Sequence, residues 1–344
     1  MILYYSGNPT GNIDRPNKPE EFEKLFSIML SYALNKKKPE KRLLYIYKAM
    51  KKKKSKIGIV KSHFLDSGAF SQWALAQKYH QEYGGDKWDY YNTPDFWKYV
   101  DDYAAFVKKY QIAIDLYANV DVIPNPELTW RNQRYLEKEH GLRPVPVVHY
   151  KTNTKWLRRY MKAGYELIAL GGLVGSTMKR SCRDWVDECF DIVCDTPKRL
   201  PKVKIHGFGV TSYKYLLRYP WWSVDSAAWD KIASYGGVCI PHKRKGKFVF
   251  DTAPYLLKCS MESPERKKRN HFLNISERER RIIKEWFSLI NIPVGKLEGE
   301  EVKEKGVVTY HVYRRIANLY FFQRFVDSLP SWPWSFQMRQ DTLL

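Results

Sequence analysis

The sequence contains little cysteine, no long apolar run and too few acids to balance its bases. Five cysteines in 344 residues, an odd number, do not suit a framework of disulfides. No stretch reaches the roughly 18 apolar residues that a membrane-spanning helix needs. Residues 1–12 lack the charged and apolar regions of a signal peptide. We therefore expect a cytoplasmic protein, or one of the host cytoplasm if phage-encoded, with no membrane partner.

The deficit of acids indicates a polyanionic partner. Lys and Arg number 59 against 37 Asp and Glu, for a net charge of +22. Basic side chains gain affinity for nucleic acids by releasing counterions from phosphates. An aromatic content of 15% exceeds that of a disordered basic protein. The candidate nucleic-acid contacts are two basic runs, Lys51, Lys52, Lys53 and Lys54, and Lys243, Arg244 and Lys245.

Short apolar or β-branched runs alternate with helix-like segments over about the first 240 residues, which is typical of parallel βα units. Eight runs predict strands: 1–7, 57–68, 112–123, 143–150, 166–175, 202–210, 221–227 and 236–242. Apolar spacing of three and four predicts helices near 20–34, 94–110, 127–140, 153–163, 180–194, 212–218 and 226–234.

Eight strands favour an α/β fold of the closed (β/α)8 TIM-barrel type. The alternative is an open doubly wound sheet, but no G-x-G-x-x-G follows an early strand. We assign the barrel to residues 1–254, with a basic insertion at 35–56. Residues 255–344 predict a helical, basic appendage, in which Ser276 and Glu279 form a capping box and 310–329 form a second helix.

Three acids stand at or just past the ends of predicted strands. They are Asp66 in "HFLDSGAF", Asp121 in "YANVDVIPNP" and Asp225 in "PWWSVDSAAW". In a barrel the carboxyl ends of all strands meet at one mouth, where the active site forms. The three carboxylates are therefore expected to converge. As alternatives, Asp225 could be a helix N-cap and Asp66 could form an Asx-turn.

Four motifs carry a resemblance to a known family. In order they are "DSGAF" (66–70), "GGLVG" (171–175), "HGFGVTS" (206–212) and "SVDSAAW" (223–229). Together they resemble the tRNA-guanine transglycosylase superfamily, and within it the bacterial and phage enzymes that insert 7-deazaguanines into DNA. The resemblance covers roughly residues 57–235.

The resemblance implies a glycosyltransferase that exchanges guanine in DNA for a 7-deazaguanine, such as 7-cyano-7-deazaguanine, without cutting the strand. Asp225 matches the nucleophile of the family, which attacks the sugar C1′ and forms a covalent intermediate. Asp66 matches the general acid/base, which protonates the departing guanine and deprotonates the incoming base. The partners are then DNA and the two free bases, and the base must be flipped out or single-stranded.

The resemblance also implies a pocket for the base. Asp121 would accept hydrogen bonds from N1–H and the 2-amino group, and His149 stands where the family usually has a Gln that donates to O6. The other implied residues are glycines that let backbone amides approach the ring and phenylalanines that stack on it: Gly171, Gly172, Gly209, Phe70 and Phe208.

Several alternatives remain open at this stage. A tRNA-guanine transglycosylase differs in the polymer and not in the chemistry, and a non-catalytic nucleic-acid-binding barrel would share the charge. A barrel glycosidase acting on free sugars would leave the charge of +22 unexplained. The cysteine trio that binds zinc in the tRNA enzymes is missing, so we expect no metal and no cofactor. An unusual zinc site would have to use Cys239, His242, Cys259 and His271.

Overall fold

The computed structural model describes residues 1–7, 26–36, 43, 44, 46, 60–261, 264–298 and 301–337. Most of the predicted basic insertion, including Lys51, Lys52, Lys53 and Lys54, lies outside the described residues. None of the helices in the described part of the chain has the length and hydropathy that a membrane crossing requires.

The centre of the fold is one sheet of eight parallel strands. Its order is β4-β3-β2-β1-β8-β7-β6-β5. The strands are β1 (Ile2–Ser6), β2 (Phe26–Ser31), β3 (Val60–Asp66), β4 (Leu116–Tyr117), β5 (Val147–His149), β6 (Leu167–Gly171), β7 (Lys204–Gly207) and β8 (Ser223–Ser226). The predicted α/β class with a parallel sheet is confirmed.

The sheet is curled, and its two edges approach each other. The ladder ends at β4 and β5, but Ala118 and Val145 form an isolated parallel bridge between them. Val145 N donates to Tyr117 O over 2.8 Å, and Asn119 N donates to Val145 O over 3.0 Å. A separate apolar cluster takes side chains from successive strands and fills the inside of the curl: Tyr4, Met29, Phe64, Ala118, Val145, Val147 and Ala169.

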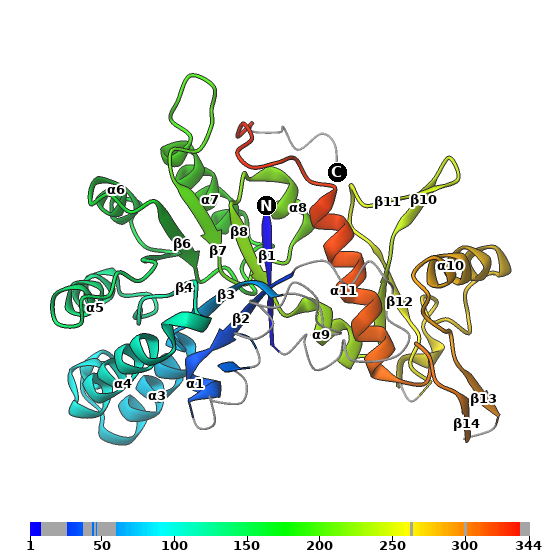
Figure 1. Ribbon diagram of the computed structural model, residues 1–344, viewed down its shortest axis with the longest axis horizontal. Helices are drawn as coiled ribbons and strands as arrows, with labels where there is room; N and C mark the ends of the chain where they lie inside the picture. The colour runs from blue at the N-terminus through cyan, green and yellow to red at the C-terminus, as the bar shows by residue number, and fades with distance from the viewer. Residues whose placement is uncertain are drawn as a thin grey trace.

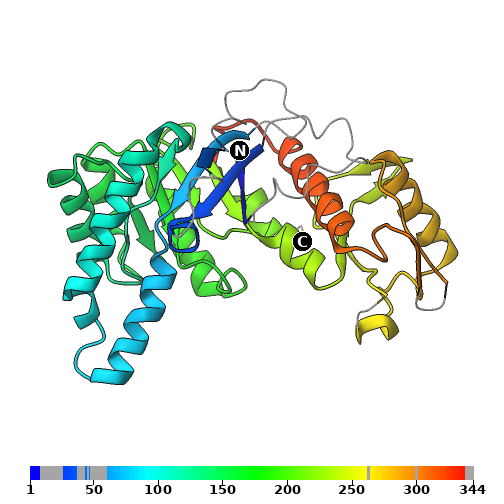
Figure 2. The same cartoon turned by 60° about the horizontal axis from the view of Figure 1, so that its bottom comes forward.

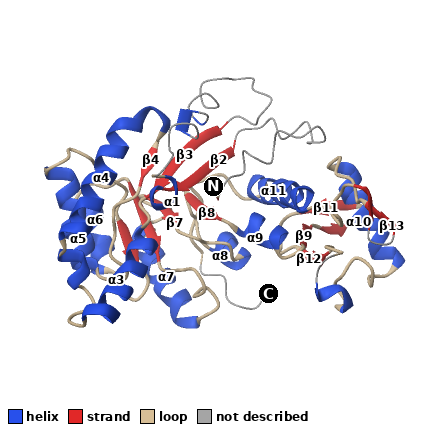
Figure 3. Cartoon of the chain, turned by 90° about the horizontal axis from the view of Figure 1, so that it is seen from below, coloured by secondary structure: helices blue, strands red, loops and turns tan. Residues whose placement is uncertain are grey.

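Helices cover the outer face of the sheet (Figures 1 and 3). They are α3 (Ala69–Tyr83), α4 (Pro94–Tyr110), α5 (Pro126–Lys138), α6 (Lys155–Lys162), α7 (Arg180–Val193), α8 (Tyr213–Arg218) and α9 (Ala228–Ser234), with short turns at η3 (Asp89–Asn92) and η4 (Gln111–Ala113). α4 and α5 begin where local chemistry sets them: Thr93 and Asn125 cap the first N–H groups, and a proline follows each.

One predicted element was wrong, and one predicted strand lies outside the main sheet. The segment predicted as a helix over 20–34 contains the strand β2 and only a short helix, α1 (Tyr32–Asn35). Residues 27–30 of its run "FSIMLS" are buried, and β2 pairs with β1 and β3. A strand covered on both faces has no alternation to distinguish it from a buried helix. The eighth predicted strand, 236–242, contains β9 (Gly237–Ile240), which pairs antiparallel with β12 (Tyr255–Lys258) outside the main sheet.

The rest of the chain lies beside the sheet (Figure 2) and is not helical throughout. Besides β9 and β12 it holds the hairpins β10 (His242–Arg244) with β11 (Lys247–Val249) and β13 (Lys296–Glu298) with β14 (Glu301–Glu304). A short turn η5 (Pro264–Lys267) and two helices, α10 (Glu277–Leu289) and α11 (His311–Asp327), complete it. The capping box of Ser276 and Glu279 is confirmed at the start of α10.

Helix α11 joins this region to the sheet. It packs against α9, β9 and β1. The buried amide of Asn318 accepts from Cys239 N over 2.8 Å and donates to Trp229 O over 3.1 Å. One side chain therefore ties α11, α9 and β9 together.

Candidate active site

The three predicted carboxylates lie at the same end of the parallel sheet. Asp66 is the last residue of β3, Asp225 lies in β8, and Asp121 follows β4. Because all strands run in one direction, these positions share one rim. Burial raises the pKa of Asp66, and the charges of Asp121 and Asp225 add to the rise.

Asp225 is held by two hydrogen-bond donors. The Ser6 hydroxyl donates to Oδ2 over 2.7 Å, and the Gly209 backbone N–H donates to Oδ1 over 2.7 Å. The residue is 8% exposed, so the carboxylate is oriented before any substrate arrives. Ser6 ends β1 and was missed in the sequence; its position at the end of "MILYYSG" is the only signal that could have found it.

Gly209 orients Asp225, whereas the family resemblance implied a role in base binding. Its φ of +65° lies in the left-handed region, and a Cβ there would clash with the Val174 side chain. Only glycine therefore fits the turn that aims this N–H at the carboxylate.

A buried histidine stands behind Asp225 and was also missed. His206 Nε2 lies 3.6 Å from Asp225 Oδ1, too far for a hydrogen bond, and no other partner faces that nitrogen in the described part of the chain. Its Nδ1 is 2.8 Å from Ser223 Oγ. Burial lowers the pKa of His206, and the neighbouring carboxylate only partly opposes this. A neutral ring with its proton on Nε2 would direct an N–H toward Asp225.

Asp66 lies in a different electrostatic environment. Burial raises its pKa from 3.8 to about 6, and the charges of Asp121 and Asp225 act in the same direction. Hydrogen bonds from the Ser31 hydroxyl and the Gly68 N–H oppose the rise. Gly68, the residue immediately before α3, has a φ of +84°, and a Cβ on it would lie 2.5 Å from Ala33 Cβ. The "DSG" motif is therefore a tight strand-to-helix turn.

Asp121 and His149, predicted to contact a base, contact each other. His149 Nε2 and Asp121 Oδ2 are 2.7 Å apart, and both residues are buried. His149 Nδ1 is buried without a partner among the described residues. A Cβ on Gly171 would lie 2.9 Å from His149 Cδ2, so this glycine makes room for the imidazole ring. Gly172, at φ +73°, turns the chain out of β6.

The two predicted stacking rings have different surroundings. Phe208 is partly buried and packs against Phe64 and His206, with ring centroids 5.9 and 4.7 Å away. Phe70 is 71% exposed and stacks on Trp73 at 5.4 Å and 28°. Phe208 is thus fixed by the interior of the sheet, and Phe70 is open to solvent.

The basic run at 243–245 is partly neutralised. Lys243 Nζ lies 2.6 Å from Glu285 Oε2, and Arg244 Nη1 lies 2.9 Å from Asp251 Oδ2. Lys245 is exposed in the turn between β10 and β11. Internal ion pairs therefore compete with phosphate for two of the three predicted contacts.

The four residues considered for zinc do not come together. His242 is exposed, and its Nε2 lies 3.0 Å from Ala253 O. Cys259 Sγ faces Gly236 O and Val307 O, and His271 Nε2 faces Ser260 O. Cys239 is wholly buried. In the portion of the chain with described coordinates, no three metal-ligating side chains form a group.

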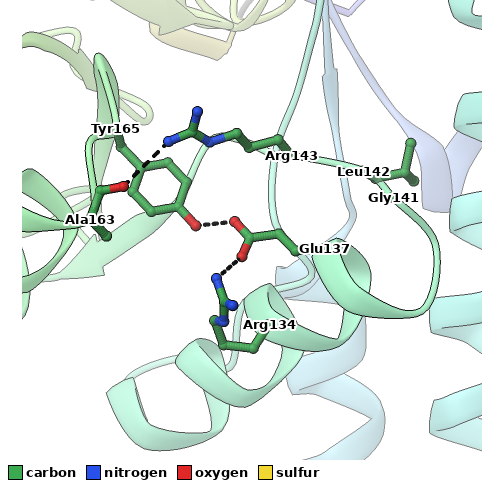
Figure 4. A pocket seen from close by; sticks show the side chains of 7 residues that line it. All are labelled: Arg134, Glu137, Gly141, Leu142, Arg143, Ala163 and Tyr165. Carbon is green, nitrogen blue, oxygen red and sulfur yellow. Dashed lines mark hydrogen bonds and ion pairs between the residues drawn. The ribbon is translucent and has the colours of Figure 1, made fainter.

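Two cavities lie at the opposite end of the strands. One, of about 400 Å³, is lined by strand beginnings that include Lys61, Asp115 and Lys204. The other, of about 360 Å³, lies between the ends of α5 and α6 (Figure 4). In it Glu137 accepts from Arg134 and the Tyr165 hydroxyl. In the second cavity these charged and polar groups therefore satisfy one another. We place the candidate active site at the rim that holds the three carboxylates.

Comparisons with protein-family models and with curated proteins find no match to this chain. Any inference of function therefore depends on the fold and on the geometry of the rim.

Proposed function

We propose that this chain is a (β/α)8-barrel transglycosylase that exchanges guanine in DNA for a 7-deazaguanine. The observation that supports this most is the pair of unlike carboxylates at one rim: Asp225, oriented by two donors, and Asp66, whose pKa of about 6 suits proton transfer. Two acids with separate roles are what substitution at an anomeric carbon with retention requires. The bridge between the edge strands and the filled interior support the closed barrel.

The chemistry divides between the two acids. An Asp225 oxygen attacks C1′ as the C1′–N9 bond breaks, and the bond electrons leave with the guanine. Protonated Asp66 gives its proton to the departing base and becomes a carboxylate. It then takes a proton from the incoming 7-deazaguanine, whose N9 attacks C1′ and releases Asp225. Each carboxylate ends the cycle in its starting state, so no cofactor is consumed.

The Asp121–His149 pair would have to open or share its hydrogen bonds when a base binds. Asp121 is the acceptor available for N1–H and the 2-amino group. His149 Nδ1, buried and unpartnered among the described residues, is the second polar atom available to the base edge.

DNA is our first choice of polymer because the zinc-binding cysteine trio of the tRNA enzymes is missing. The tRNA-guanine transglycosylase is the alternative within the same chemistry, and a non-catalytic nucleic-acid-binding barrel is the alternative outside it.

Trapping the covalent intermediate tests the proposal. The protein is incubated with guanine-containing DNA, denatured and examined by mass spectrometry for a protein–DNA adduct. We expect an adduct with the native sequence and none with Asp225→Asn, which keeps the shape of the side chain. Radiolabelled guanine supplied with duplex DNA or tRNA identifies the polymer. Label entering tRNA alone would refute the DNA assignment, and a native protein that incorporates no label into either polymer would support the non-catalytic alternative.

A further inference from the structure

Helix α6 presents one face made only of cations. Lys155, Arg158, Arg159 and Lys162 are all exposed. Their spacing of i, i+3, i+4 and i+7 places them on one side of a helix. Trp156, Leu157 and Tyr160 are buried on the other side. We call the four exposed residues the α6 stripe.

No acid among the described residues neutralises the α6 stripe. None of its members forms an ion pair with another described residue, and the helix contains no acid. Five of the six acids of the neighbouring helices α5 and α7 have other partners: Glu137 binds Arg134, Asp184 lies 3.8 Å from Arg180 and Arg183, Asp187 binds Arg218, Asp191 binds Arg199 and Glu188 accepts from Thr154. The sixth, Glu127, is exposed and forms no ion pair with the α6 stripe. An ordinary solvated face mixes charges of both signs, so a face of four cations is suited to binding an external anion.

Aromatic rings fix part of the α6 stripe. The Arg159 guanidinium lies 4.0 Å from the Trp130 ring centroid and 4.9 Å from that of Trp156. In contact with two indoles, this side chain loses less conformational freedom on binding than a free arginine would.

The stripe begins close to the candidate active site. β5 ends at His149 on the rim, and α6 starts at Lys155 after a short loop. Lys151 in that loop is exposed and extends the line of cations toward His149. Figures 1 and 3 place α6 on the outside of the sheet, at the end of the molecule away from β10, β11 and α10.

We propose that the α6 stripe binds the phosphate backbone of duplex DNA beside the flipped nucleotide. The assignment of the strand as substrate rests on the proposed function. Four residues spaced over two turns extend about 10 Å along the helix. Phosphates of one strand follow at about 3.4 Å of duplex axis, so the stripe covers about three of them. The backbone contacts hold the duplex in place, while the rim residues act on the base.

The test removes three charges without disturbing the packed arginine. Lys155→Ala, Arg158→Ala and Lys162→Ala are combined, and Arg159 is kept. The control combines Lys78→Ala, Lys87→Ala and Lys108→Ala, which are exposed cations outside α6, so both variants lose the same charge. Thermal unfolding by circular dichroism verifies that both fold.

Binding of a fluorescein-labelled 30-base-pair duplex is followed by anisotropy at several KCl concentrations, with no free base present. Each lost phosphate contact reduces the slope of log affinity against log salt by about 0.9. We expect the α6 variant to have a slope shallower by about 2 to 3 and an affinity roughly 10- to 100-fold lower at about 0.1 M KCl. The control variant is expected to change the slope by less than about 1.

Equal effects of the two variants, or no effect of the α6 variant, would overturn the assignment. So would a loss confined to tRNA or to phosphatidylserine vesicles with duplex binding intact. If the native protein binds DNA through the α6 stripe but exchanges no base, the assignment of this surface is supported and the proposed function is refuted. A native protein that exchanges base while the α6 variant binds DNA normally would refute the surface alone.

Discussion

Replacing Asp66 with Asn tests the electrostatics of the rim through stability, without a substrate. In the folded chain the pKa of Asp66 is about 6, against 3.8 for the unperturbed group. The gap of about 2.2 pH units, at about 1.36 kcal/mol each, corresponds to about 3 kcal/mol. Asn is neutral at every pH, so it is not subject to this cost of ionisation.

The contribution of Asp66 to the free energy of unfolding depends on whether the folded or the unfolded state binds the proton more tightly. Because the folded pKa is the higher one, the folded state holds the proton more tightly than the unfolded chain does. The stabilisation from this group is fully present below about pH 3.8 and is lost as the pH rises through about 6. The native protein therefore loses up to about 3 kcal/mol across this window, and Asp66→Asn does not. The variant should be more stable at pH 7.5 by up to about 3 kcal/mol and nearly equal to the native protein at pH 4.

Urea unfolding followed by circular dichroism at both pH values measures the difference. Asp195→Asn is the matched control, since it makes the same change of charge at a carboxylate whose side chain is 79% exposed and lies 3.4 Å from Lys202. A surface pair of this kind contributes at most about 1 kcal/mol. The reasoning is refuted if the Asp66→Asn variant is less stable than the native protein at pH 7.5, or if it is stabilised equally at both pH values.

Three further predictions concern the reaction and use formation of the DNA adduct in a single turnover. Gly209→Ala should abolish adduct formation, because it moves the N–H that is aimed at Asp225. Gly175→Ala is the control, since Gly175 has a similar positive φ and open space around it; equal losses in both variants would show only backbone strain. Ser6→Ala removes a hydrogen bond to a charged group, worth about 1.5–3 kcal/mol, and should slow adduct formation roughly 10- to 150-fold. Ser6→Thr keeps the hydroxyl and is the control; a loss below twofold in Ser6→Ala would refute the role of Ser6 in orienting Asp225. With Asp66 as the acid, the rate should fall about tenfold per pH unit above about 6, and a flat profile from pH 6 to 8 would exclude it.

The sequence predicted the parallel sheet and placed the three carboxylates at the ends of its strands, because both depend on local signals. The ends of these strands are marked by residues next to them in the sequence. "DSG" at Asp66 forms a tight turn that requires glycine, and Asp225 follows an apolar run. The α4 and α5 caps were equally local. Such features are set within a few residues, so composition and spacing are enough to find them.

Contacts between segments that are distant in the chain could not be predicted from the sequence. "FSIMLS" matches a buried helix as well as a buried strand, and only its pairing with β1 and β3 decides. The role of Ser6 depends on β1 lying next to β8. The pairing of Asp121 with His149 depends on the connection across β4 and β5. Each of these requires the sheet order, which no single segment encodes.

The hydrogen bond from Ser6 to Asp225 joins residues 219 positions apart. It forms only when β1 has taken its place between β2 and β8, so a chain with an incomplete sheet leaves Asp225 without one of its two donors. Under the proposed chemistry, a half-assembled protein would hold its reactive acid loosely. Competence to attack a nucleotide would then arrive together with the finished architecture, and partly folded molecules in the cell would pose little danger to the genome.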